Sequence, residues 1–328
     1  MKCKKTKIMV CLLTVFFVSL QIQAAETLIG EWNMDGAVVT KTVSVLNSNN
    51  GQGGGFINES RTVIESSYGD VVFGGPRAAS YYAIYPASQT AGGLGASGEA
   101  GDKSLLVRGG EKESAFIGGV MYEVESGFKI ELNFKLFEPR EPANVGVTYY
   151  PNGWITVPNS KPILVTGGIN RFKIELVTDG EGSGTAKLNL VCWPASGSAV
   201  SLETDFAVNV DNWNHVAAWL EGGNLYIQLN NGTVFSNSAG ISLKASFDPA
   251  LSYNGLTFGA WNGASVWPRA YLDNLKLYSI EPICGDWGYL KGDLDKDCKI
   301  DFIDIDLFIQ QWLSCTEPGV TDCVNVNQ

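Results

Sequence analysis

Apolar and polar residues alternate most strictly between residues 128 and 136. One face carries Phe128, Ile130, Leu132, Phe134 and Leu136, and the other carries Lys129, Glu131, Asn133 and Lys135. A repeat of two residues is the period of a β-strand with one buried face. We therefore predict a strand here, with its apolar face in a core.

The same alternation recurs along the chain between short turns that are rich in glycine and asparagine. The predicted strands, in chain order, are 171–176, 187–190, 213–220, 225–229, 256–260 and 270–278. The first two form a hairpin across 179–184, and Asn231-Gly232 provides another tight turn. No long helical period precedes the C-terminal tail. This pattern predicts a mainly β fold, a two-sheet antiparallel sandwich.

Segment 74–102 lacks this regular alternation. It is rich in Gly, Ala and Ser and contains Tyr81, Tyr82 and Tyr85. We predict a long surface connection with room for a lone strand.

The N-terminus has the pattern of a secretory signal peptide. Four lysines lie in residues 1–7, an apolar run spans 8–20, and small residues follow at Ala24 and Ala25. The run is too short for a confident membrane span. We predict a signal peptide at 1–25, a sandwich domain at 26–280 and a tail at 281–328, in a secreted or cell-surface protein whose mature chain has no membrane span.

Removing the signal peptide makes the chain more acidic. The full sequence has 23 basic and 34 acidic residues, and losing four lysines leaves a net charge of −15. Nucleic acids and anionic membrane surfaces require positive charge on a partner, so both are excluded as binding partners. Charged residues make up only 17% of the chain and hydrophobic ones 45%, which is typical of a globular protein.

Five cysteines remain in the mature chain. In an oxidising compartment we expect Cys284, Cys298, Cys315 and Cys323 to form two disulfides and Cys192 to be free and buried. A bridge between Cys298 and Cys315 is disfavoured because a helix of three turns would hold them about 15–20 Å apart. The other two pairings stay open.

The tail contains a calcium-binding pattern. Carboxylates lie at positions 1, 3, 5, 9 and 12 of a twelve-residue loop, which are Asp293, Asp295, Asp297, Asp301 and Asp304, and Lys299 at position 7 would contribute its backbone oxygen. Five carboxylates in twelve residues repel one another unless a hard cation lies among them. Phe302, Ile305, Phe308, Ile309 and Trp312 then recur at helical spacing. We predict Ca²⁺ in the loop, followed by an amphipathic helix.

Residues 292–313 resemble a dockerin repeat, the calcium module by which secreted bacterial polysaccharide-degrading proteins attach to cohesins. Dockerins usually carry two repeats, whereas this chain has one, and Cys298 replaces the usual glycine at loop position 6. The four tail cysteines are also atypical. The resemblance implies a cohesin-like or other surface protein as the partner of the tail.

A second resemblance covers most of the body. Trp213-Asn-His-Val-Ala, Gly223-Asn-Leu-Tyr-Ile-Gln-Leu-Asn-Asn-Gly232 and Tyr271-Leu-Asp-Asn-Leu-Lys-Leu-Tyr278 follow one another as in laminin-G-like, concanavalin-A-like jelly rolls. The resemblance implies that residues 26–280 form a two-sheet antiparallel jelly-roll sandwich, followed by the small C-terminal calcium-loop-plus-helix module. It does not settle function, because such domains include lectins, adhesive modules and glycosidases.

Catalytic residues are not evident in the sequence. A retaining glycosidase of this fold needs paired carboxylates on one strand, and the strand at 128–136 has only Glu131 on its polar face. A lyase would use a histidine, and the chain has only His215, which we interpret as structural. We assign no catalytic residue, and a divergent glycoside hydrolase or polysaccharide lyase stays an alternative.

Two aromatic segments have the composition of glycan-binding loops. Rings and an amide in turn-rich surroundings suit sugar binding, and the candidates are Tyr149, Tyr150, Trp154, Trp261, Asn262 and Trp267. The alternative is that these rings plug the ends of the sandwich.

Asp273 is a candidate for a second calcium site. Alternation places it on the same face as Leu275 and Leu277, where a carboxylate needs a partner. Related jelly rolls hold a structural calcium with an aspartate in this strand and backbone oxygens near the first strand, here 32–35. A salt bridge or a β-bulge that turns Asp273 outward is the alternative.

Together these patterns favour a secreted, non-catalytic protein that binds a polysaccharide or surface glycan through its jelly roll. The calcium-dependent tail would attach it to a partner. Besides the enzyme, a structural surface protein that binds other proteins is the remaining alternative.

Overall fold

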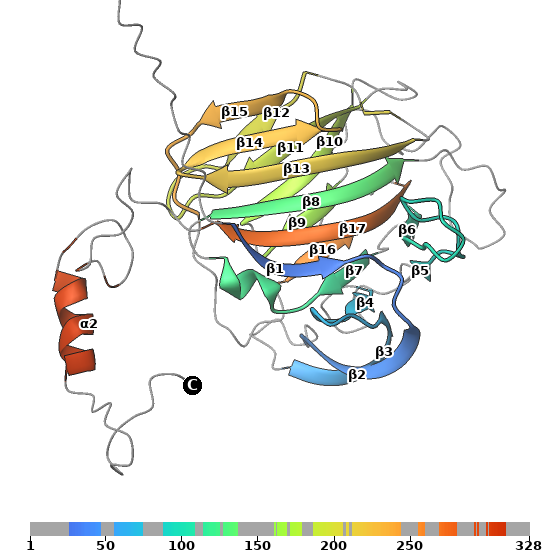
Figure 1. The fold of residues 1–328 in the computed structure, drawn as a ribbon, viewed down its shortest axis with the longest axis horizontal. Helices are drawn as coiled ribbons and strands as arrows, with labels where there is room; N and C mark the ends of the chain where they lie inside the picture. Colours follow the sequence, from blue (N-terminus) through green and yellow to red (C-terminus); the bar gives the residue numbers. More distant parts are fainter. Residues whose placement is uncertain are drawn as a thin grey trace, which may run out of the picture.

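In the computed structural model the chain folds as two antiparallel sheets that pack face to face in a sandwich (Figure 1). The predicted mainly β sandwich is confirmed. The structure describes residues 26–46, 56–74, 88–108, 114–124, 127–136, 161, 163–168, 171–178, 186–205, 208–209, 212–243, 255–259, 269–280, 292, 294, 300 and 302–312. The predicted signal peptide lies outside these residues.

The first sheet has eight strands. Its order is β15 (Val234–Ser238), β14 (Asn224–Leu229), β13 (Trp213–Glu221), β8 (Gly127–Leu136), β17 (Arg269–Ile280), β6 (Leu105–Arg108) and β5 (Ser88–Gln89). β1 (Glu26–Trp32) also pairs with β17, so the first and last strands of the body lie side by side (Figure 1).

The second sheet has nine strands. Its order is β12 (Val200–Glu203), β11 (Ala186–Cys192), β10 (Phe172–Thr178), β9 (Ile163–Gly167), β16 (Leu256–Gly259), β7 (Ser114–Ile117), β4 (Val71–Phe73), β3 (Phe56–Ile64) and β2 (Val38–Leu46). β10 and β11 pair in register from Phe172–Cys192 to Thr178–Ala186, which confirms the predicted hairpin.

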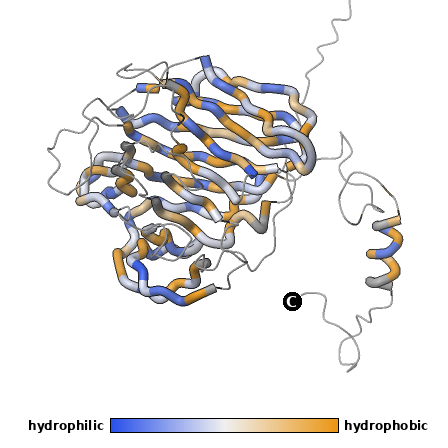
Figure 2. The backbone as a smooth tube through the Cα atoms, turned by 180° about the vertical axis from the view of Figure 1, so that it is seen from behind, coloured by the Kyte–Doolittle hydropathy of each residue, from blue (hydrophilic) through white to orange (hydrophobic). Residues whose placement is uncertain are grey.

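The core lies between the two sheets. Every second residue of β8 is buried, and Figure 2 shows hydrophobic and hydrophilic residues alternating along the strands. The rings of Phe128 on β8 and Phe172 on β10 stack at 4.2 Å, which joins the sheets through their apolar faces. Cys192 is free and buried, as predicted, and burial raises the pKa of its thiol.

One strand departs from the predicted alternation. The register between β17 and β8 shifts by one residue between Asp273 and Lys276, and Asn274 has φ 48°. This is a β-bulge, with one extra residue on β17. Asp273 therefore does not continue the alternation of Leu275 and Leu277. The bulge of the alternative prediction is present, but it does not turn Asp273 to solvent, because the residue is fully buried.

Residues 88–102, the described part of the segment predicted as a surface connection, are more regular than their composition indicated. Within it, β5 pairs with β6 from Ser88–Leu106 to Gln89–Leu105, which is the lone strand. The backbone N–H groups of Gly93, Leu94 and Gly95 all point to the carbonyl oxygen of Asp102, at 2.7–3.2 Å. The loop between β5 and β6 is thus closed on itself.

The predicted tail helix is α2 (Phe302–Trp312). Its apolar stripe faces solvent, because Phe302 is 86% exposed and Ile305, Phe308 and Ile309 are each about half exposed. Among the described residues, no helix is long and apolar enough to cross a membrane.

Candidate functional site

The six aromatic and amide residues predicted to bind glycan lie outside the described residues. These are Tyr149, Tyr150, Trp154, Trp261, Asn262 and Trp267. Their role stays a prediction.

The calcium loop is described at its two ends. Asp304, at loop position 12, is 2% exposed, and its Oδ1 accepts the backbone N–H of Leu294 at 2.5 Å. Gly292, just before the loop, lies against the side chain of Ile300 at position 8. Both contacts bring the end of the loop back to its start, which is the closure that a cation-wrapping loop needs. Asp293, Asp295, Asp297, Lys299 and Asp301 lie outside the described residues, as do the four tail cysteines, so calcium and the disulfides stay predictions.

Asp273 is fully buried, and a buried carboxylate needs hydrogen-bond partners or a cation. Its partners are backbone donors: Ala96 N–H to Oδ2 at 2.8 Å and Asn274 N–H to Oδ1 at 2.7 Å. In the described part of the chain, no three acidic, histidine or cysteine side chains are placed to hold one metal ion. The carboxylate therefore has hydrogen-bond partners without a cation, and calcium at Asp273 stays a prediction.

The surroundings of Asp273 favour its protonated form. Burial is the main cause that raises its pKa, to about 7, and the nearby carboxylates of Asp102 and Asp35 raise it further. The two backbone N–H groups act in the opposite direction. Asp102 accepts the N–H of Ser97 and Asp35 accepts that of Lys103, so the three carboxylates anchor one loop.

A cavity of about 460 Å³ opens between two turns of the sandwich. One wall is the end of β1 with the residues that follow it, and the other is the end of β3 with the turn to β4. The polar residues that line it are Glu31, Asn33, Glu65, Ser66 and Ser67, and the aromatic ones are Trp32 and Tyr68. Its volume is that of a small-ligand site.

Hydrogen bonds from one side-chain amide to the backbone hold the wall that follows β1 in shape. Gln89 Nε2 donates to the carbonyl oxygens of Met34 at 2.6 Å and Gly36 at 2.9 Å. Met34 has φ 59°, a backbone conformation that costs a non-glycine residue about 1–3 kcal/mol and is common where a site is held in a fixed shape. A side chain at position 36 would collide with the carbonyl of Glu65, so glycine lets the two walls approach closely.

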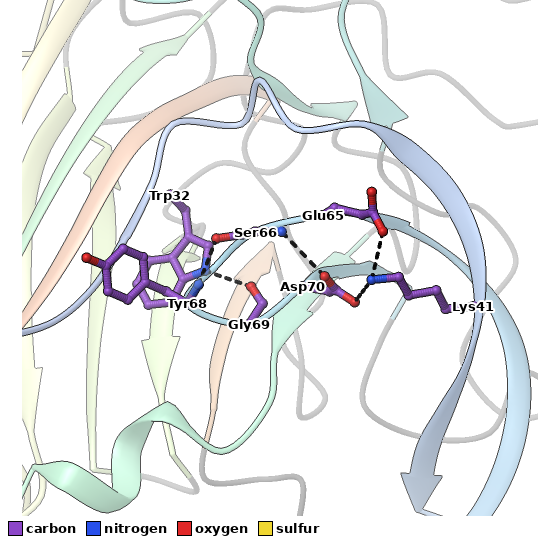
Figure 3. A network of polar contacts seen from close by, with 7 residues as sticks. All are labelled: Trp32, Lys41, Glu65, Ser66, Tyr68, Gly69 and Asp70. Carbon is purple, nitrogen blue, oxygen red and sulfur yellow. Dashed lines mark hydrogen bonds and ion pairs between the residues drawn. The ribbon is translucent and has the colours of Figure 1, made fainter.

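The second wall is held by a charged network (Figure 3). Lys41 Nζ lies 2.8 Å from Asp70 Oδ2 and 3.0 Å from Glu65 Oε1, and Asp70 Oδ1 accepts the N–H of Ser66 at 3.4 Å. The hydrogen bond to Asp70, followed by that to Glu65, raises the pKa of Lys41. These pairs are partly exposed, so they fix the shape of the turn more than they stabilise the fold.

Two rings meet at the cavity. The indole N–H of Trp32 donates to the carbonyl of Gly69 at 2.9 Å, and the Tyr68 ring packs against Trp32 edge-on at 6.2 Å (Figure 3). Trp32 is buried, whereas Tyr68 is 43% exposed. Within the described part of the chain, no hydrogen bond involves the hydroxyl of Tyr68 or Ser67. A fixed ring with free hydroxyl groups beside it is a suitable surface for a sugar.

The charge of the cavity disfavours acidic ligands. Glu31 and Glu65 both line it, and each is about half exposed. Their lysine partners, Lys276 and Lys41, each offset one carboxylate, but Asp70 adds another beside the cavity. Neutral or amine-bearing sugars therefore fit better than sialic acids or uronates.

Sequence reasoning missed this cavity. Its signal is the run Ser66-Ser67-Tyr68-Gly69-Asp70, in which an aromatic residue lies among turn-forming residues. The partner segment at 31–36 lies about 30 residues earlier, and only the pairing of distant strands brings the two together.

His215, which we interpret from the sequence as structural, lies on β13. Its ring is partly buried, but among the described residues its Nδ1 has no hydrogen-bond partner. Burial is the main cause that lowers its pKa, so the ring is neutral at neutral pH.

No known family model matches this sequence, and no curated protein matches it. Many solved chains are similar in fold, among them the following three. Domain 4 of an extracellular arabinanase from Geobacillus stearothermophilus, in complex with arabinotriose, is 11% identical, with 78% of this chain and 93% of that chain covered and a TM-score of 0.36. The binding domain of botulinum neurotoxin serotype G is 10% identical over 67% of this chain and 47% of that one, with a TM-score of 0.39. The Ruminococcus gnavus sialidase CBM40 bound to α2,3-sialyllactose is 10% identical over 54% and 88%, with a TM-score of 0.34. These likenesses are too weak to assign a family or a ligand.

Proposed function

We propose that this protein is a secreted, non-catalytic carbohydrate-binding protein. The cavity between the turns that follow β1 and β3 binds a terminal or branching sugar of a glycan. The observation that supports this most directly is the half-exposed Tyr68 ring, packed on Trp32 beside hydroxyl, amide and carboxylate groups.

Binding at this cavity would use fixed groups. Gln89, Gly36 and the Lys41–Asp70 pair hold both walls in place, so a ligand would not have to order them. The Tyr68 ring would stack on the apolar face of the sugar, and the free hydroxyl and carboxylate oxygens would accept its hydroxyl protons.

The C-terminal loop and α2 form the second half of the proposal. We assign Ca²⁺ to the loop with Asp293, Asp295, Asp297, Asp301, Asp304 and the backbone oxygen of Lys299 as ligands. The folding back of Asp304 onto Leu294 supports this. The exposed apolar stripe of α2 would then contact the protein to which the tail attaches, a cohesin-like or other surface protein.

The cavity is tested with a substitution of its exposed ring. Tyr68→Ala should weaken binding of mono- and disaccharides by about tenfold, because it removes the stacking surface and leaves the walls in place. Isothermal titration against a panel of neutral and amino sugars measures the change. Leu94→Ala, a similarly exposed apolar residue on a separate loop, is the matched control. Unchanged affinity in Tyr68→Ala, or no binding of any sugar by the unaltered protein, would show that the cavity is not a sugar site.

A further inference from the structure

The outer face of the eight-stranded sheet carries an unusual set of side chains. Along β8, β13 and β14 the residues that alternate with the core are only partly buried. On β13 these are Trp213, His215, Trp219 and Glu221, whereas the small residue Ala217 on the same face is buried between them. Because they are the alternates of buried residues, they project away from the core.

Two aromatic pairs lie on this face. Trp219 on β13 and Tyr226 on β14 are directly opposite in register, and their rings stack at 5.0 Å with 10° between their planes. Trp213 on β13 and Tyr271 on β17 lie on either side of Lys135 on β8, with their ring centroids 6.5 Å apart. Each pair is a ready-made apolar surface that the sheet holds in place.

The pairs mark the two ends of an extended surface. Trp213 and Trp219 are six residues apart on one strand, so about 20 Å separates them at the rise of a β-strand. This span is longer than one or two sugar rings. It suits a run of several rings in an oligosaccharide chain.

Polar groups occupy the stretch between the pairs. His215 on β13 is opposite Asn133 on β8, and Ala217 is flanked by Gln228 and Glu131. In the described part of the chain, Nδ1 of His215 is buried without a hydrogen-bond partner. Because this nitrogen is buried, a ligand would contact the exposed part of the ring and not Nδ1. Ala217 is also buried, so the longer side chains around it would form the contacts at the centre.

Most of the charges around this surface are paired. Lys129 lies 3.1 Å from Glu26 and 3.0 Å from Glu131, and Lys276 lies 3.1 Å from Glu31. The surface therefore does not provide the excess positive charge that a polyanion requires, and the chain as a whole is strongly acidic. Hydroxyl groups without formal charge are the chemistry that its amides, paired charges and rings would recognise.

We propose that the outer face of the eight-stranded sheet binds an extended, uncharged polysaccharide chain, which lies along β8 and β13 from the Trp219–Tyr226 pair to the Trp213–Tyr271 pair. This site is separate from the cavity at Tyr68, and it does not depend on that cavity. The sheet face would bind an internal stretch of a polymer, whereas the cavity would bind a terminal or branching sugar.

Affinity electrophoresis of the full mature protein tests this proposal. The gels contain xyloglucan, galactomannan, arabinan or mixed-linkage β-glucan as neutral polymers, and alginate or polygalacturonate as acidic ones. We expect at least one neutral polymer to retard the protein. Trp219→Ala and Trp213→Ala should each lower the affinity by about tenfold, because each removes a stacking surface at one end. Of the oligosaccharides of that polymer, the hexasaccharide should bind at least about tenfold more tightly than the disaccharide, because only the longer one reaches both pairs.

Matched variants distinguish binding at this surface from binding at the cavity and from a folding defect. Trp193→Ala alters a partly exposed tryptophan next to β11 of the nine-stranded sheet and should leave retardation unchanged. Trp219→Phe keeps a ring and should restore most of the affinity, which excludes a folding defect as the cause. The proposal is wrong if only acidic polymers retard the protein, or if Trp219→Ala and Trp213→Ala behave as the unaltered protein. Loss of retardation in Tyr68→Ala alone would assign binding to the cavity and overturn the sheet-face site. Loss in the two tryptophan variants alone would support this site and count against the cavity.

Discussion

His215 is the chain's only histidine, so its ionisation can be followed as a single signal. Burial lowers its pKa, Lys129 and Lys276 lower it further, and Glu131 acts in the opposite direction. We expect proton NMR of the imidazole to give a pKa below the ordinary value of about 6.5. A pKa at or above that value would contradict the burial of the ring.

The lowered pKa of His215 also determines the direction in which the stability of the fold changes with pH. As the pH falls, the unfolded chain protonates this histidine before the folded chain does. The contribution of the neutral histidine to the free energy of unfolding is therefore fully present above the unfolded pKa. It is lost as the pH falls from about 6.5 through the lowered folded pKa. The free energy of unfolding of His215→Gln, measured by urea denaturation at a series of pH values, should lack this part of the pH dependence. A denaturation profile identical to that of the unaltered protein between those two pKa values would contradict it.

Single positions also show where sequence patterns fail. Alternation placed Asp273 with Leu275 and Leu277 because a sequence does not reveal one extra residue in a strand. The bulge depends on Asn274, which adopts a positive φ, and on the loop whose Ala96 N–H reaches the carboxylate. Burial of the carboxylate followed from the sequence, but its partners did not.

Elements were predictable where the chain is regular over many residues. β8, the β10–β11 hairpin, the β13–β14 hairpin and α2 all lie where period and turn residues placed them. Short elements such as β5, with two residues, carry no such period. Their existence depends on partners far away in the sequence, as in the pairing of β4 with β7. The cavity at Tyr68 escaped prediction for the same reason.

A buried arginine joins two elements that the sequence did not connect. Arg171, 1% exposed, donates to the carbonyls of Met121 at 2.8 Å and Val124 at 2.6 Å, at the end of the 3₁₀ helix η1 (Val120–Glu123). Burial lowers its pKa to about 10, so it stays charged at neutral pH. The side chain thus satisfies the carbonyl of Val124 and adds a second donor to that of Met121, which also accepts the Val124 N–H at 3.4 Å.

Arg171→Met should therefore destabilise the sandwich by about 2–4 kcal/mol, because it removes two charge-assisted hydrogen bonds and leaves the Val124 carbonyl without this donor. Equilibrium urea denaturation measures the loss. Lys187→Met, which removes a partly exposed cation on β11, should change the free energy of unfolding by less than about 1 kcal/mol. Equal effects of the two substitutions would show that the hydrogen bonds of Arg171 to η1 contribute no more to the free energy of unfolding than a partly exposed ion pair does.

At the scale of the whole molecule, the sequence predicted a sandwich because many short amphipathic strands need two apolar faces to meet. It could not predict which surfaces of the sandwich are candidate ligand sites. The cavity and the sheet face use residues from β1, β3, β8, β13, β14 and β17, and only the folded topology places them together. The tail is the opposite case, because its ligands lie in one twelve-residue run and their spacing is readable directly.

The predicted calcium site in that run is tested on the whole protein. Without a cation the five carboxylates repel one another, whereas a bound cation stabilises the folded loop by about 2.7 kcal/mol at a hundredfold excess over its Kd. Differential scanning calorimetry of the full mature chain should show a transition that moves to lower temperature when EGTA replaces CaCl₂. Asp293→Ala combined with Asp304→Ala should remove this difference, because it deletes the first and last ligands of the loop. Asp306→Ala, on the exposed side of α2 beyond the loop, should keep it. A transition that EGTA does not move would remove calcium from the tail, and a shift that persists after deletion of 281–328 would place calcium on the sandwich, as predicted for Asp273.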